Sequence, residues 1–340
     1  ALAAVNVNQS TPLTFATVSG TSYLRMANGS NFTVTNGAVT FNAGRIVFGV
    51  GSGTTESFTL TNNSASPVTW GSGALTPLAV GTGPAGGGGR NMTIGGSGDW
   101  VFNSKFDGGI MAVVTKTGAG TLTLNAAGNN LANIATTPLT ISQGSIVFSG
   151  NANLNSGAYA SPISNSGALV YSSSANQTFY GAITGTGSLT KDTGSGSILT
   201  LSGTNNYSGA TTLTSGTLAF TGDSTTGSLT TADFTTLAVK LTSPSVSPLK
   251  PSSLTLGASA FDSSNLNIDF SASTNPTAPL IDLGAGSVTL NQEVYISLSG
   301  LTALTSSTNT IKLLNYGSIS GAGNFNLLTT SFGRSTFDLN

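Results

Sequence analysis

The chain has 340 residues, of which only 6% are charged, and its formal net charge is −1. Ordinary soluble domains are about one quarter charged, so this chain has no charge excess to attract nucleic acid or an anionic membrane surface. It contains neither cysteine nor histidine, which excludes disulfides, thiolate metal sites, cysteine nucleophiles and the commonest acid–base group. We therefore expect no enzyme, no cofactor and no nucleic-acid partner.

The N-terminus reads Ala1-Leu2-Ala3-Ala4, which is typical of the mature side of a signal-peptide cleavage site. A chain trimmed at this point is the alternative. The segment that follows, Ala4–Asn8, alternates apolar and polar residues and predicts a strand. No apolar run approaches the length that a bilayer-spanning helix needs, so we expect no membrane span in this chain.

Residues 1–95 are predicted to form an irregular N-terminal β region. Alternating runs such as Phe32–Val34 and Phe58–Leu60 predict half-buried strands joined by long polar loops. One loop, Gly81–Arg90, formally matches the Gly-x-Gly-x-x-Gly dinucleotide fingerprint. That site needs a helix after the glycines, whereas a strand follows here, so we interpret the segment as a flexible loop.

Residues 96–241 contain a short repeat in which glycine precedes an apolar-x-apolar strand. The glycines at positions 98, 120, 144, 167 and 187 recur at a nearly constant step of a little over twenty. This spacing is typical of one coil of a β-solenoid, in which each strand lies above its equivalent in the previous coil. An array of β-hairpins in a sandwich is the alternative, because glycine also marks hairpin turns.

The segment Ile163–Phe220 carries a longer pattern, with Gly-Thr-Gly-Ser-Leu-Thr-Lys at 185–191 and Leu-Thr-Leu-Ser-Gly-Thr-Asn-Asn-Tyr-Ser-Gly at 199–209. It resembles the autotransporter-associated β-strand repeat, and a weaker copy covers Lys116–Phe148. The resemblance implies a right-handed parallel β-helix in a secreted, extracellular or bacterial cell-surface protein. The matching positions are Gly185, Gly187, Leu189, Lys191, Leu199, Leu201, Gly203, Asn205, Tyr207, Gly209, Gly216 and Leu218.

The C-terminal part is divided by a proline-rich segment at residues 242–253. Pro244, Pro248 and Pro251 are predicted to exclude regular pairing there, which makes the segment a loop or a boundary. Residues 254–340 return to alternating strands, and we expect a C-terminal β continuation or cap of the solenoid.

Three carboxylates form the best candidate acidic patch. The separation of Asp262 and Asp282 is close to one step of the repeat, so they are predicted to stack in adjacent coils with Asp269 between them. Such a patch would suit a cation or a carbohydrate-active site. Solvated loop residues are the alternative interpretation.

Both ends of the chain alternate like free strands, which suggests self-assembly by strand addition. Head-to-tail addition of this kind is heterologous and gives open filaments. The alternative is that both strands pair within the chain. The candidate residues are Ala3, Ala4, Val5, Asn6, Val7, Asn8, Phe337 and Leu339.

Together these patterns predict a non-catalytic extracellular structural protein, such as a surface stalk or a fibre or matrix subunit. Its expected partner is itself, end to end. An adhesin module that binds glycans or surfaces, with extracellular polysaccharide as a partner, is the first alternative, and a carbohydrate-active β-helix enzyme is the second.

Overall fold

The computed structural model describes residues 2–16, 24–42, 46–48, 56–71, 78–79, 90–104, 106–107, 111–127, 139–241, 243, 245, 247–259, 262–271, 276–301, 311–328, 331–332 and 335–336. The chain divides into two compact units, Ala1–Gln177 and Thr178–Asn340. No helix among the described residues is long and apolar enough to cross a membrane.

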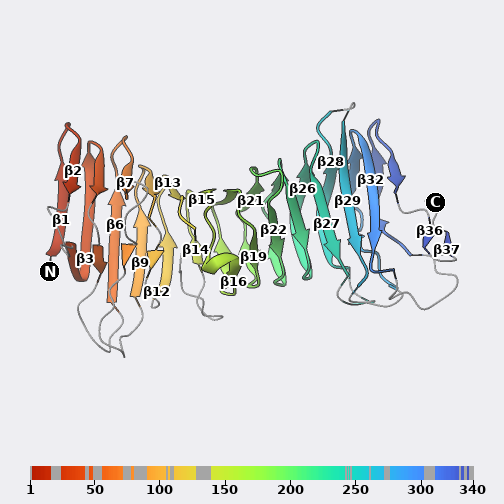
Figure 1. The fold of residues 1–340 in the computed structure, drawn as a ribbon, viewed down its shortest axis with the longest axis horizontal. Coiled ribbons are helices and arrows are strands. Elements are labelled where there is room, and N and C mark those ends of the chain that lie inside the picture. Colours follow the sequence, from red (N-terminus) through yellow and green to blue (C-terminus); the bar gives the residue numbers. More distant parts are fainter. Residues whose placement is uncertain are drawn as a thin grey trace. The chain divides into compact units, whose positions relative to one another are not determined.

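In the N-terminal unit the chain winds through three faces in a constant order (Figure 1), and all the strand pairs described there are parallel. The first face holds β1 (Leu2–Asn8), β3 (Leu24–Asn36), β6 (Glu56–Asn62), β9 (Arg90–Gly95), β12 (Met111–Lys116), β14 (Leu139–Ile141) and β17 (Ile163–Asn165). The second holds β2 (Leu13–Ala16), β4 (Val39–Asn42), β7 (Val68–Trp70), β10 (Trp100–Phe102), β13 (Thr121–Leu124), β15 (Ser145–Gly150) and β18 (Ala168–Ser173). The third face holds the start of β3, then β5 (Ile46–Phe48), β8 (Leu78–Ala79), β11 (Phe106–Asp107) and β16 (Ala158–Tyr159), which follows the short 3-10 helix η1 (Asn155–Gly157).

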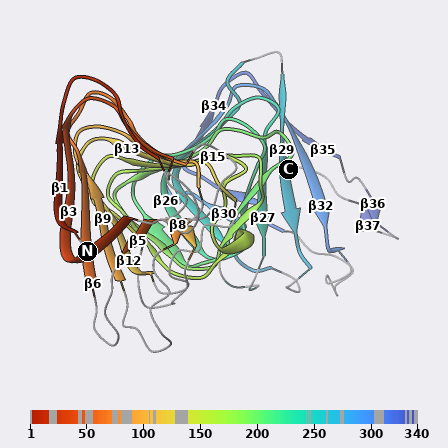
Figure 2. The same cartoon turned by 60° about the vertical axis from the view of Figure 1, so that its left-hand side comes forward.

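The C-terminal unit repeats this plan, and Figure 2 shows its third face from another side. The first face holds β20 (Ile183–Gly185), β23 (Asn205–Tyr207), β30 (Ile281–Asp282) and β33 (Leu314–Asn315). The second holds β21 (Ser188–Lys191), β24 (Thr211–Leu213), β31 (Ser287–Leu290) and β34 (Ser318–Ser320), while β26 (Ser224–Thr231) and β28 (Leu249–Leu256) run through both. The third holds β22 (Ile198–Leu201), β25 (Thr217–Phe220), β27 (Thr236–Lys240), β29 (Ser263–Asp269), β32 (Glu293–Ser299) and β35 (Phe325–Leu327). Strand β19 (Gln177–Phe179) lies at the boundary of the units, and β36 (Ser331–Phe332) and β37 (Ser335–Thr336) form an antiparallel hairpin.

Alternation of apolar and small polar residues explains why each strand has one buried side. In β13 the side chains of Leu122 and Leu124 are buried, while the intervening threonines are half-buried. Equivalent inward positions lie above one another at the spacing of paired strands, about 4.8 Å. The rings of Phe41, Trp70 and Phe102 therefore form a continuous column, with successive centroids 5.0 and 4.9 Å apart.

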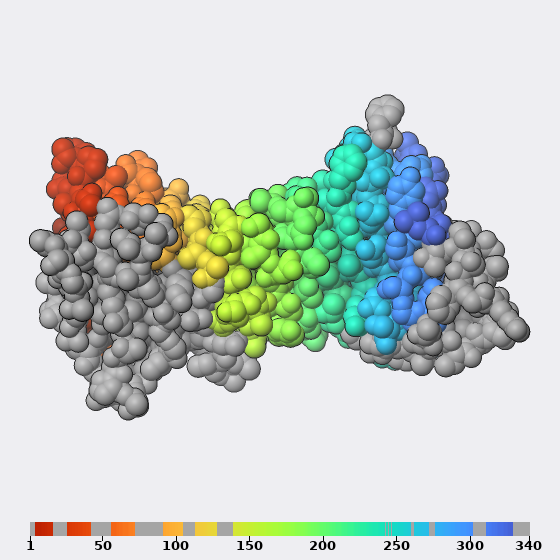
Figure 3. All heavy atoms as spheres, in the orientation of Figure 1, coloured from red at the N-terminus to blue at the C-terminus, as the bar shows by residue number. Residues whose placement is uncertain are grey.

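Glycines mark the corners because backbone packs directly on backbone there. Gly96 has φ +102°, a conformation that favours glycine, and a Cβ at Gly118 in the next coil would lie 2.4 Å from the carbonyl oxygen of Gly96. Within the C-terminal unit, Figure 3 shows the atoms of successive coils lying directly against one another.

The parallel register confirms the predicted β-solenoid class. Leu122 pairs with Ile146, and Ile146 pairs with Leu169, so each coil here advances the chain by a little over twenty positions, as the glycines predicted. The alternative of a hairpin sandwich is wrong, because β36 and β37 are the one antiparallel pair among the described residues. Parallel stacking also includes the described strands from β1 to β9 in the N-terminal unit and from β28 to β35 in the C-terminal unit, so it extends beyond the predicted 96–241 core.

The prediction that residues 242–253 exclude pairing is wrong for their second half. Leu249–Ser253 belong to β28, and Pro251 is in register with Thr226 of β26. Proline removes one ladder hydrogen bond, but its φ suits an extended strand. Pro251 also lies where β28 passes from the first face to the second, since Leu249 pairs with β30 and Leu254 with β31. Pro244 and the predicted loop at 81–89 lie outside the described residues.

Candidate functional site

The structure does not bring Asp262, Asp269 and Asp282 together. Asp262 precedes β29 and Asp269 ends it, so an extended strand of seven residues separates them, a length of about 20 Å. Asp282 ends β30 in a different sheet. Among the described residues no group of three acidic side chains is placed to hold a metal ion.

The coil length explains this outcome. Coils in this region are longer than the predicted step, because Asn265 pairs with Tyr295 and Ile281 pairs with Leu314. The neighbour of Asp262 is instead Asp233, from the turn before β27. Ser259 bridges the two carboxylates: its backbone N–H donates to Asp233 Oδ1 at 3.2 Å, and its hydroxyl donates to Asp262 Oδ2 at 3.0 Å. No sequence signal pointed to this pair, because the length of the intervening coil was unknown.

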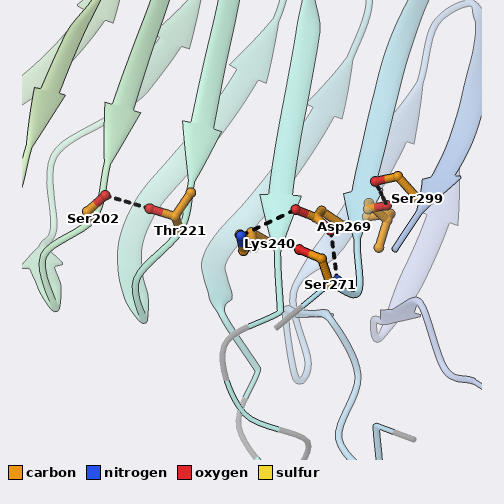
Figure 4. Close-up of polar contacts among 7 residues, drawn as sticks. Ser202, Thr221, Lys240, Asp269, Ser271 and Ser299 are labelled. Carbon is orange, nitrogen blue, oxygen red and sulfur yellow. Dashed lines mark hydrogen bonds and ion pairs between the residues drawn. The ribbon is translucent and has the colours of Figure 1, made fainter. Parts of the chain in front are cut away.

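Asp269 belongs to an outward row at the ends of the third-face strands (Figure 4). It lies in register with Lys240, and the Lys240 Nζ to Asp269 Oδ2 distance is 3.5 Å. Burial opposes the ionised form of Asp269, but hydrogen bonds from Ser271 and the charge of Lys240 outweigh it, so the pKa of this carboxyl lies below its usual value. In the same row the hydroxyls of Ser202 and Thr221 are 2.6 Å apart.

Asp282 has a separate set of partners in the last coils. Asn315 Nδ2 donates to Asp282 Oδ1 at 2.7 Å, and Lys312 Nζ donates to Asn315 Oδ1 at 2.7 Å. The hydrogen bond from Asn315 is the main reason that the pKa of Asp282 is lowered, and the charges of Lys250 and Lys312 add to it.

These carboxylates are poorly suited to general acid catalysis. A general acid needs a pKa near the working pH. Backbone hydrogen bonds, chiefly from Ala258, lower the pKa of Asp233, and the pKa values of Asp269 and Asp282 are lowered as described. The arrangement of these three groups therefore favours permanent charges that hold coil edges together.

Two lysines are buried at the ends of inward rows, Lys116 in β12 and Lys191 in β21. Lys116 Nζ donates to the carbonyls of Thr117 and Gly118 at 2.7 and 2.8 Å, and reaches Gln143 in the next coil at 3.5 Å. Lys191 Nζ donates to Thr193 and, at 3.2 Å, to Ser215 in the next coil. Each ammonium group thus binds the corners of two successive coils.

The first coil of the N-terminal unit, Leu2–Ala16, leaves inward side chains partly uncovered. Val5, Leu13 and Phe15 are half-buried, whereas their register partners in the next coil are buried: Phe32, Val39 and Phe41. Strand β1 pairs with β3 and β2 with β4, and no other described strand pairs with their outer edges. The predicted assembly residues Ala3–Asn8 therefore lie on a strand that pairs within the chain along one edge and has no described partner along the other.

The last coil of the C-terminal unit, Leu314–Leu327, shows the same feature. Ile319 is 44% exposed, although its register partner Val288 is buried. Phe325 and Leu327 are half-buried, and they pair with the buried Val294 and Ile296. No described strand pairs with the outer edges of β33, β34 and β35. Phe337 and Leu339, the other predicted assembly residues, lie outside the described residues.

Neither of these coils carries a charged side chain. Residues 1–24 and 313–333 contain no Lys, Arg, Asp or Glu. Natural proteins usually protect free strand edges with charges, prolines, bulges or a covering element. The sequence pattern pointed to the N-terminal strand. It did not identify the partly uncovered inward residues Leu13, Phe15, Ile319 and Phe325, because their position at the end of the stack follows from the order of the coils. The stretches without charged residues were the available sequence signal for these two coils.

No protein-family model, curated protein or solved structure matches this chain.

Proposed function

We propose that the protein is a non-catalytic structural subunit that assembles end to end into a fibre or matrix. The observation that carries this proposal is the pair of open terminal coils. Each has a strand edge with no described partner, half-buried inward apolar side chains and no charged side chain. A parallel coil presents its backbone donors and acceptors to another strand that runs in the same direction.

Assembly of this type joins two different surfaces, so each added copy leaves a free end for the next one. A heterologous contact that does not close a ring produces an open filament. The continuous parallel ladder within each unit supplies the mechanical element of such a subunit. The low charge leaves little electrostatic repulsion between copies.

An extracellular or bacterial cell-surface location is part of the proposal. It is supported by the resemblance of Ile163–Phe220 to the autotransporter-associated repeat. Only 10 Lys and Arg residues occur in 340, so trypsin-like proteases would meet few cleavage sites outside the cell.

The proposal is tested by measuring mass and shape against protein concentration. Light scattering and negative-stain microscopy are expected to show filaments that lengthen as the concentration rises. Ile319→Lys places a charge in the open core of the last coil and is expected to leave a folded monomer. Ser318→Lys, one residue away on the outward side, is the matched control and should still assemble. A parent protein that is monomeric at all concentrations, or an Ile319→Lys variant that assembles like the parent, would contradict the proposal.

A second function, binding of an extracellular polysaccharide, is favoured by Tyr180. This side chain follows β19 and is 57% exposed, and the neighbouring Phe179 carbonyl accepts a hydrogen bond from the Ser202 backbone N–H at 2.8 Å. Tyr180 therefore adjoins the row of hydroxyls that contains Ser202 and Thr221. An exposed ring beside hydroxyls suits stacking on a sugar face. Co-sedimentation with insoluble cellulose or chitin should fall on Tyr180→Ala but not on Phe234→Ala, which removes a ring that is 73% exposed at the opposite ends of the strands.

A further inference from the structure

We infer that the joint between two copies has a single register, in which Ile319 of one copy lies beside Leu13 of the next. This inference rests on the proposed end-to-end assembly and adds the identity and alignment of the strands that meet. The occupant of each open end is a second copy of this chain.

The order of the faces supports a copy of the same chain as the partner. In both units a coil passes through the first, second and third face in the same order, as in β6, β7 and β8 or in β30, β31 and β32. A partner for the last coil must supply strands in that order and direction. The first coil does so, with β1, β2 and the start of β3 facing β33, β34 and β35.

The corners fix the register on the second face. Gly317 is two residues before Ile319 and packs on the corner below, where its N–H donates to the Gly286 carbonyl at 2.8 Å. Gly286 is likewise two residues before Val288, the register partner of Ile319. The corners at Gly286 and Gly317 thus keep the same distance from the first inward residue of their strands.

The first coil has the same spacing. Thr11 is two residues before Leu13, and the next corner packs on the segment from Gln9 to Thr11, since a Cβ at Gly37 would lie 2.2 Å from the Gln9 carbonyl oxygen and 3.4 Å from that of Thr11. Gly37 is itself two residues before Val39, the partner of Leu13. If the Gly317 corner of one copy packs on the Thr11 corner of the next copy, Ile319 therefore lies beside Leu13.

Side-chain size agrees with this alignment. Two residues beyond Leu13 is Phe15, whose ring stacks on Phe41 with centroids 4.8 Å apart and remains half-buried. Two residues beyond Ile319 is Gly321, which packs on the backbone of Leu290. The wide ring of Phe15 thus meets a position without a side chain. A slip of two residues sets Ile319 against Phe15 and places the Gly317 corner over the strand residue Leu13.

Cysteine cross-linking tests the register without interference, because the chain has no native cysteine. The alignment pairs the outward residues Ser320 and Thr14, and adjacent parallel strands place such Cα atoms about 4.8 Å apart, within disulfide range. A two-residue slip pairs Ser318 with Thr14 instead. Size-tagged Ser320→Cys or Ser318→Cys protein is mixed with untagged Thr14→Cys protein at concentrations that give filaments, then oxidised and separated without reductant.

We expect at least tenfold more mixed disulfide from Ser320→Cys with Thr14→Cys than from Ser318→Cys with Thr14→Cys. Asn6→Cys, on the outward side of β1, is a further control and should link poorly to Ser320→Cys because it belongs to the first face. Filaments that cross-link through Ser318 or Asn6 would overturn the register and leave end-to-end assembly standing. A parent protein that forms no filaments would overturn both.

Discussion

The buried ammonium group of Lys116 donates a hydrogen bond of 2.8 Å to the backbone carbonyl oxygen of Gly118. Gly118 has φ +67° and turns the chain between β12 and β13. A side chain from one face therefore holds the following corner, and Lys191 in the C-terminal unit binds the corner after β21 in the same way.

The first prediction is that stability rises with pH through this lysine. Burial lowers the pKa of Lys116 to about 8, although Asp99 raises it. Between about pH 8 and 10.5 the unfolded chain binds more protons at this group than the folded chain, so the free energy of unfolding increases with pH. Lys116→Met should reduce that increase by up to about 3 kcal/mol. Urea unfolding at several pH values between 8 and 9.5 checks it, and parallel curves for parent and variant would contradict it.

The second prediction concerns the loss of stability at higher pH through buried tyrosines. Burial raises the pKa of Tyr171 to about 12, despite a hydrogen bond with Ser173. Its hydroxyl donates to the Ala175 carbonyl at 2.8 Å. The unfolded tyrosine ionises near pH 10, so the stabilisation is present below about pH 10 and is lost as pH rises toward 12. Tyr171→Phe should be about 1 kcal/mol less stable than the parent at pH 8, and the difference should close by about pH 11. A constant difference in circular-dichroism unfolding curves would argue against this assignment.

The third prediction compares two adjacent asparagines. Asn205 is buried and joins three coils: its Nδ2 donates to Gly203 and Ser224 at 2.8 and 3.0 Å, and its Oδ1 accepts from the Ile183 N–H at 2.9 Å. Asn205→Ala should lower the free energy of unfolding by about 3 kcal/mol, because buried partners lose their hydrogen bonds. Asn206→Ala, on the exposed side of β23, should change it by less than about 0.5 kcal/mol. Equal effects in denaturant titrations would refute the role of Asn205.

The fourth prediction uses two glycines of the C-terminal unit. A Cβ at Gly209 would lie 2.0 Å from the Gly187 carbonyl oxygen, whereas a Cβ at Gly196 has nothing within 4 Å. Gly209→Ala must push two coils apart and should cost more than about 3 kcal/mol. Gly196→Ala should be neutral or slightly stabilising, because it reduces the freedom of the unfolded chain. Thermal unfolding of both variants separates the cases, and a stable Gly209→Ala protein would show that this corner is not tightly packed.

Much of the fold was accessible from the sequence because it depends on local patterns. Alternation such as Thr121–Leu124 defines which side of a strand is buried, and a glycine before each strand marks a corner wherever it recurs. Both signals are independent of distant residues, so they predicted the solenoid and the step from Leu122 to Ile146 correctly.

The candidate sites depended on coil length, which local patterns do not encode in irregular coils. Loops can lengthen a coil without changing the strands that stack, so Leu199 pairs with Leu218, whereas Leu254 pairs with the much more distant Val288. For this reason the sequence placed Asp262 with Asp282, although the structure pairs Asp269 with Lys240 and sets Asp282 beside Asn315.

The class of fold, the inward rows and the lack of charge at both ends are properties of the residue pattern alone. The identity of the outermost coils, and of the edges that have no described partner, became known from the three-dimensional stacking. Burial of Val39 but not Leu13, and of Val288 but not Ile319, follows from having a coil on both sides rather than on one. The residues themselves are alike in chemistry, so their difference is one of position in the stack.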